Sequence, residues 1–149
     1  MVKTKIAGIA DLSHIESLVE MYHEFEGIQS AVETRRETIS RLLDPSNTFG
    51  FIVIASRGDN PIGYAAICYG FSIEFGGRDS FLDEIFVEKS SRGSGVGGAL
   101  VKLAVEIAKE RKVKALHLEV SRSNEKAEHF YSNLGFKSRK NFNLMSKNL

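Results

Sequence analysis

The residue pattern with the clearest chemistry is a glycine-rich turn between an apolar segment and an amphipathic one. Four glycines fall within six positions, directly after an arginine, in the order Arg92-Gly93-Ser94-Gly95-Val96-Gly97-Gly98. Glycine lets a backbone approach a ligand closely and adopt positive φ angles. The free N–H groups and the dipole at the start of the following helix favour a bound anion. The turn therefore predicts a phosphate or pyrophosphate site, to which Arg92 would add a fixed positive charge.

Two other interpretations of this turn are weaker. Gly93, Gly95 and Gly98 also fit G-x-G-x-x-G, the fingerprint of dinucleotide-binding folds. In those folds the first glycine follows the strand almost directly, whereas the polar segment 88–92 separates Val87 from the first glycine here. A dinucleotide-dependent oxidoreductase is therefore disfavoured, and a purely structural turn would need fewer glycines.

The composition indicates a folded chain with almost no net charge. Of its 149 residues, 20 are basic and 19 acidic, which gives a net charge of +1, and 42% are hydrophobic. Such a balance argues against a nucleic-acid partner, and no apolar run approaches the roughly 20 residues of a membrane-spanning helix. A lone cysteine cannot form an internal disulfide, which favours a reducing, cytoplasmic location. We expect one domain over residues 1–149.

Apolar spacing predicts two helices in the N-terminal third. The first has its apolar stripe over residues 15–25, and either Asp11 or Ser13 would cap it. Thr34 would cap the second, which must end near Leu43 because a proline follows.

Segments rich in β-branched and aromatic residues predict the strands. Two further helices follow, one opened by the glycine turn and one that begins at Asn124 and ends at Gly135. The expected strands cover 3–7, 49–55, 62–71, 81–87, 115–120 and a segment within 136–146. The order β-α-α-β-β-β-α-β-α-β predicts an α/β (α+β) fold with a mixed, mostly antiparallel central sheet and helices on both faces.

Two motifs resemble signatures of the GNAT superfamily of N-acetyltransferases. Arg92-Gly-Ser-Gly95-Val-Gly97 resembles R/Q-x-x-G-x-G/A, which binds the pyrophosphate of acetyl-coenzyme A (acetyl-CoA) in that family. Asn124-Glu-Lys-Ala127-Glu-His-Phe130-Tyr131-Ser-Asn-Leu-Gly135-Phe136 resembles N-x-x-A-x-x-x-Y-x-x-x-G-F. The order of elements is also similar, so the resemblance covers nearly the whole chain. It implies an acetyl-CoA-dependent N-acetyltransferase.

The resemblance implies a set of coenzyme-binding residues. In this family the strand before the turn pairs with the pantetheine arm, and here the N–H of Ile85 would lie near the thioester carbonyl. A donor at that place stabilises the oxyanion. Asn124 would cap its helix and reach the coenzyme. The full set is Ile85, Phe86, Val87, Arg92, Gly93, Ser94, Gly95, Gly97, Gly98, Asn124 and Tyr131.

The resemblance also implies an acid, while the base stays open. Tyr131 matches the tyrosine that protonates the departing thiolate in many members, although its spacing alone would also suit a core aromatic. Asp83 and Glu84 are candidates for the base that deprotonates the acceptor amine. Neighbouring strand residues point to opposite faces, so at most one of these two can face the amine. Glu84 is slightly favoured, and Glu119 is a third choice.

The cysteine and the histidines are not expected to take part. Cys68 lies within a predicted strand and is interpreted as a core residue rather than a nucleophile. The histidines have no metal-ligand spacing and are interpreted as ordinary residues, so no metal is expected. They are His14, His23, His117 and His129.

These assignments predict direct transfer of an acetyl group, in a ternary complex, to a primary amine of a small molecule or peptide. The alternative is a non-catalytic module that binds acyl-CoA. Glu16, Glu20 and Glu24 recur every four residues on the first helix, where they are either a solvated face or an attraction for a cationic acceptor. Because family members often dimerise, a homodimer is expected.

Overall fold

A computed structural model describes all residues from 1 to 149. The chain forms two compact units, Met1–Leu118 and Glu119–Leu149, and each is described by itself. The expected single-domain organisation stays a prediction. None of the helices combines the length and the apolar character needed to cross a bilayer.

A five-stranded sheet organises the first unit, with its strands in chain order across the sheet. The first four strands pair antiparallel with their neighbours, and the fifth pairs parallel with the fourth. This confirms the expected mixed, mostly antiparallel sheet. The strands are β1 (Val2–Ile6), β2 (Gly50–Arg57), β3 (Asn60–Ser72), β4 (Gly77–Val87) and β5 (Leu116–His117).

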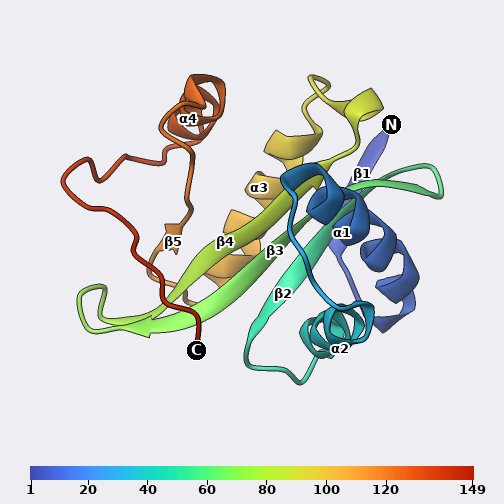
Figure 1. The fold of residues 1–149 in the computed structure, drawn as a ribbon, viewed down its shortest axis with the longest axis horizontal. Coiled ribbons are helices and arrows are strands. Elements are labelled where there is room, and N and C mark those ends of the chain that lie inside the picture. The colour runs from blue at the N-terminus through green and yellow to red at the C-terminus, as the bar shows by residue number, and fades with distance from the viewer. The chain divides into compact units, whose positions relative to one another are not determined.

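Helices cover both faces of this sheet (Figure 1). The helices α1 (Leu12–Glu26) and α2 (Val32–Leu43) pack on one face, and α3 (Val96–Glu110) packs on the other. Side chains of β2 alternate between the two faces of the sheet. Ile52 and Ile54 join the hydrophobic cluster under α1 and α2, while the buried residues between them point toward the opposite face. The expected fold class is therefore confirmed.

Asp11, one of the two expected caps, stands at the N-cap position of α1, but its side chain bonds residues that precede it rather than the first turn of the helix. The carboxylate accepts the Gly8 N–H at 2.9 Å and a Lys5 ammonium hydrogen bond at 2.8 Å. Burial would raise the pKa of Asp11, but the hydrogen bonds from Lys5 and Gly8 and the Lys5 charge outweigh it and lower the pKa. Ser13 lies inside α1 and does not cap it.

Asp11→Asn is expected to lower the free energy of unfolding by about 2 kcal/mol at neutral pH, because the charge-assisted bonds are lost. The lowered pKa means that the unfolded chain binds this proton more readily than the folded chain. The stabilisation is therefore present above the usual value of 3.8 and disappears as the pH falls through the lower folded value. Denaturant titrations of wild type and variant, at neutral pH and below pH 3.8, should show the gap closing in acid. An equal gap at both pH values would contradict this account.

Three sequence-based predictions of secondary structure are wrong. The helix α2 begins at Val32, so Thr34 lies within it and its carbonyl accepts the Thr38 hydroxyl instead. The strand β5 has two residues rather than the expected 115–120. No strand forms in 136–146, where the backbone hydrogen bonds are those of the Phe136 N–H to the Tyr131 carbonyl and of the Phe142 N–H to the Arg139 carbonyl. A strand needs a neighbouring strand to satisfy its backbone hydrogen-bonding groups, and the sequence pattern of a segment does not indicate whether such a neighbour is present.

The second unit contains α4 (Glu125–Asn133), which begins and ends as expected. The Asn124 side chain accepts a backbone N–H three residues later, at 3.1 Å. Gly135 follows the helix with φ +93°, and the Phe136 N–H donates to the Tyr131 carbonyl at 3.1 Å. A left-handed glycine with this bond is a Schellman ending, which satisfies the last carbonyls of the helix.

Candidate active site

A β-bulge interrupts β4 at its most acidic point. Ala66 of β3 pairs with Glu84, but the next residue, Ile67, pairs with Leu82, so Asp83 is the extra residue. The bulge breaks the strict alternation of side chains. Asp83 and Glu84 consequently line the same cavity, so the strict alternation assumed from the sequence does not hold here, and the choice between them as the base stays a prediction.

This acceptor-side cavity has a volume of about 190 Å³ and lies between α1, α2 and the sheet. Apolar side chains, including Val19, Ile39 and Ile52, form much of its wall. Charged and polar groups from both helices, β3 and β4 complete it, among them His23, Arg35, Tyr64 and the two carboxylates. Such a pocket, apolar with a few convergent polar groups, is suited to holding a small ligand in one orientation.

Both oxygens of the Glu84 carboxylate are engaged inside this cavity. Oε2 accepts the Tyr64 hydroxyl at 2.7 Å, and Oε1 lies 2.6 Å from His23 Nε2. An ionised carboxylate only accepts, so Nε2 of His23 carries a hydrogen. The other ring nitrogen, Nδ1, lies 3.1 Å from the Ser30 hydroxyl, at an exposed residue. The carboxylate is therefore connected to the surface through one imidazole.

Tyr64 is the buried anchor of this network. Its ring has no exposed surface, and burial, followed by the Glu84 charge, raises the pKa of Tyr64 far above its usual value. The hydroxyl thus remains a donor at any working pH and holds Glu84 in place.

His23 is the functional candidate that sequence reasoning missed. It was interpreted as an ordinary residue, yet it contacts a carboxylate 61 positions away in the chain. No spacing or motif carries a signal for a pair this distant, because only the packing of α1 on β4 brings the two side chains together.

The edge of β4 that faces away from β3 is open beyond the bulge. The Glu88 N–H donates to the Ile62 carbonyl of β3 at 2.9 Å. Backbone groups alternate between the two edges of a strand, so those of Ile85 and Val87 point away from β3. On that side β5 pairs with β4 only near Ser80. The structure thus leaves the Ile85 N–H unpaired, as pairing with a pantetheine arm would require.

Two other members of the expected coenzyme set already have partners. The Phe86 backbone faces β3, and its ring is buried in the core under α1 and α2. Arg92 Nε donates to the Val87 carbonyl at 2.8 Å, and its guanidinium lies 5.1 Å from the centroid of the Phe25 ring. Arg92 therefore anchors the end of β4 and keeps its charge beside the glycine turn.

The glycine turn itself is open and preformed. Gly93 and Gly95 have φ angles of 75° and 85°, and a side chain added at either, or at Gly98, would meet no atom within 4 Å. The Ser94 hydroxyl donates to a backbone carbonyl of the preceding turn at 2.7 Å, which fixes the loop. The first backbone bond of α3 is the Ala99 N–H to the Gly95 carbonyl, so the N–H groups before Ala99 lack intrahelical acceptors. These donors and the free space fit a pyrophosphate.

Tyr131 and Asn124 belong to the second unit. The Tyr131 ring packs edge-on against Phe130 and Phe136, with centroids 5.1 and 5.8 Å away. Burial raises the pKa of Tyr131, so its hydroxyl keeps its proton well into the alkaline range. The expected contacts of Tyr131, Asn124 and Glu119 with acetyl-CoA or the acceptor stay predictions.

Cys68 has the properties of a structural thiol. It is half-buried, and burial, with smaller effects from the Asp83 and Glu84 charges, raises its pKa to about 11. The thiolate is the nucleophilic form of cysteine, and it is scarce at neutral pH under these conditions. This agrees with the expectation that Cys68 forms no covalent intermediate.

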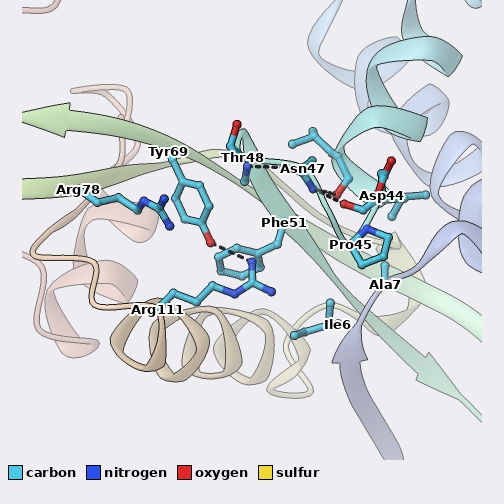
Figure 2. Close-up of a pocket in the computed structure, with 13 residues that line it drawn as sticks. Ile6, Ala7, Asp44, Pro45, Asn47, Thr48, Phe51, Tyr69, Arg78 and Arg111 are labelled. Carbon is cyan, nitrogen blue, oxygen red and sulfur yellow. Dashed lines mark hydrogen bonds between the residues drawn. The ribbon is translucent and has the colours of Figure 1, made fainter.

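A larger cavity of about 400 Å³ lies elsewhere in the first unit and contains none of the expected site residues. Figure 2 shows Arg78 and Arg111 at Tyr69, at the end of the cavity away from Asp44. Arg111 donates to the Tyr69 hydroxyl at 2.9 Å, and Arg78 lies 4.5 Å from the centroid of the Tyr69 ring. Arg111 follows the last residue of α3, about 22 Å along the helix from the glycine turn. The cavity therefore lies away from the glycine turn, and Leu42 is the one residue that lines both cavities.

Comparison with known proteins places this chain and its fold in a known class. Residues 15–136 match the family model described as "Acetyltransferase (GNAT) family". The chain therefore belongs to the GNAT family of acetyltransferases. It is an N-acetyltransferase, and this family normally uses acetyl-CoA.

Relatives and solved structures agree with this assignment. The chain is 27% identical over 145 residues to the thialysine N-epsilon-acetyltransferase of Mus musculus, covering 91% of this chain and 85% of that protein. It is 35% identical over 91 residues to an uncharacterized N-acetyltransferase of Methanocaldococcus jannaschii, a match that spans 60% of this chain and only 40% of the archaeal protein. An integron cassette protein from the mobile metagenome of Cole Harbour Salt Marsh has a similar fold, with a TM-score of 0.85, 26% identity and coverage of 98% of this chain and 90% of that one.

Proposed function

We propose that this protein transfers the acetyl group of acetyl-CoA to a primary amine by direct attack within a ternary complex. The observation that carries the proposal is the continuity of β4. The strand runs from two cavity-lining carboxylates, past the unpaired N–H of Ile85, to an open turn of glycines. A pantetheine arm on that edge would place its thioester beside Glu84 and its pyrophosphate at the turn.

The chain's own residues account for each proton in the reaction. An alkylamine is protonated at neutral pH, and Glu84 takes its proton so that the nitrogen lone pair can attack the thioester carbonyl carbon. The Ile85 N–H stabilises the resulting oxyanion. The carbon–sulfur bond then breaks, and Tyr131 protonates the departing thiolate of coenzyme A. His23, through its Nε2 hydrogen, and Tyr64 hold the Glu84 carboxylate in place, and Glu84 returns its proton to solvent after the product has left.

The size of the cavity favours a small acceptor. Its 190 Å³ is below the roughly 300–1,000 Å³ of pockets for drug-sized ligands. The mouse relative is named for acetylation of an amine at the end of a side chain. We propose that the acceptor of this protein is an aliphatic primary amine small enough to fit this cavity.

Calorimetric titration with acetyl-CoA, with NADH as the control, tests the proposal. We expect micromolar binding of acetyl-CoA and none of NADH. Release of free coenzyme A with a panel of small amines then tests turnover. Absence of acetyl-CoA binding would remove the proposed function, and binding without turnover of any amine would favour the non-catalytic module.

Tyr131→Phe is expected to lower kcat about 100-fold, because the leaving thiolate loses its proton donor. The dissociation constant of acetyl-CoA should stay within about twofold, since the ring remains. Calorimetry and steady-state kinetics separate the two effects. Tyr69→Phe is the matched control, because Tyr69 lines the other cavity, and it should leave kcat unchanged. Full activity of Tyr131→Phe would rule out its role as the acid.

A further inference from the structure

We propose that Arg35 is the carboxylate-binding end of the acceptor site, and that the acceptor is a free amino acid with a terminal side-chain amine. The inference rests on the proposed function, because Glu84 and Asp83 define where the reacting amine lies. It adds a second recognition point and a substrate class.

The Arg35 guanidinium is largely buried without a good partner. Its side chain is 12% exposed and lines the acceptor-side cavity. Its nearest acid, Glu20, is 57% exposed and lies 3.5 Å away, beyond the 2.7–3.2 Å typical of N–H···O hydrogen bonds. A guanidinium has five donors, and a buried charge is costly unless it is paired and hydrogen-bonded. Arg35 is thus placed to receive an anion from the cavity.

The adjacent arginine shows that this arrangement is not a general property of α2. Arg36 is 57% exposed, pairs closely with Glu16 and does not line the cavity. Neighbouring helix residues point in different directions, so only Arg35 turns toward the sheet. The contrast provides a matched control for experiments.

The cavity is complementary to a zwitterion with an apolar chain. Asp83 and Glu84 form its acidic wall, Arg35 its cationic wall, and aliphatic side chains such as Val19 and Ile39 lie on the remaining walls. An ammonium would bind at the acids while a carboxylate makes paired hydrogen bonds with the planar guanidinium. An amine without a carboxylate would leave the enclosed Arg35 with only its long contact to Glu20, and a site built for a polar group rejects ligands that lack it.

L-Lysine and cadaverine provide the sharpest test, because they differ only by the carboxylate. With saturating acetyl-CoA, we expect kcat/KM at least about tenfold higher for lysine than for cadaverine. Arg35→Gln should lower the value for lysine about 10- to 100-fold, mainly through KM, and change the value for cadaverine by less than about threefold. Arg35→Lys should recover part of the loss. Arg36→Gln, the matched control, should leave both substrates within about threefold of wild type.

Two outcomes would overturn the inference while the proposed function stands. These are equal turnover of the two amines by the wild type, or an equal loss for both in Arg35→Gln. If neither amine is acetylated, NMR titration of the acetyl-CoA-free protein with lysine tests the role of Arg35 independently of turnover. Lysine binding that Arg35→Gln weakens and Arg36→Gln does not would support the inference without turnover, and absence of lysine binding would overturn it.

Discussion

Gly95→Asp is expected to weaken acetyl-CoA binding by more than about 100-fold. Gly95 has a φ angle of 85° and caps α3 where the free N–H groups gather. An added side chain would project into the open space proposed for the pyrophosphate. Its negative charge would then meet the phosphates, and like charges in contact cost several kcal/mol. Calorimetric titration measures the loss directly.

Gly76→Asp is the matched control for this variant. Gly76 also has a positive φ, of 72°, with open space around it, but it lies in the turn between β3 and β4, at the opposite end of β4. Its replacement introduces the same charge and similar backbone strain away from the proposed site. Acetyl-CoA binding by this control should stay within about twofold of wild type. If both aspartate variants bind equally well, the anion site does not lie at the glycine turn.

Glu84→Gln is expected to lower kcat about 1,000-fold, within the range for loss of a general base. Glutamine keeps the shape of the side chain and still accepts the Tyr64 hydroxyl, so the fold and the dissociation constant of acetyl-CoA should change little. It cannot take the proton of the ammonium. Raising the pH should therefore restore part of the rate, because a larger fraction of the acceptor is already neutral.

Asp83→Asn distinguishes the roles of the two carboxylates that line the cavity. Asp83 is the bulged residue, whereas Glu84 is held at both oxygens and connected to His23. We expect Asp83→Asn to lower kcat by less than about tenfold, because it removes charge beside the amine but not the base. A larger loss for Asp83→Asn than for Glu84→Gln would assign the base to Asp83.

The local features of the fold were predictable because they depend on residues close together in the chain. The ends of α4 follow from Asn124 and Gly135, whose side-chain acceptor and left-handed backbone act on their own helix. The start of α3 follows from the glycine turn for the same reason. The predicted strand within 136–146 failed because a strand depends on a neighbour elsewhere, and a pattern of β-forming residues does not supply one.

By itself, the sequence determined the class of this protein. Two motifs and the order of elements sufficed to identify an N-acetyltransferase because they resemble those of the GNAT family, to which the family model assigns residues 15–136. Only the tertiary structure decided which side chains meet inside the acceptor-side cavity. The bulge at Asp83, the His23–Glu84 contact and the burial of Arg35 arise where α1, α2 and β4 pack together. Burial, charge and contact at those positions depend on residues far apart in the chain, and no spacing along it encodes their distance.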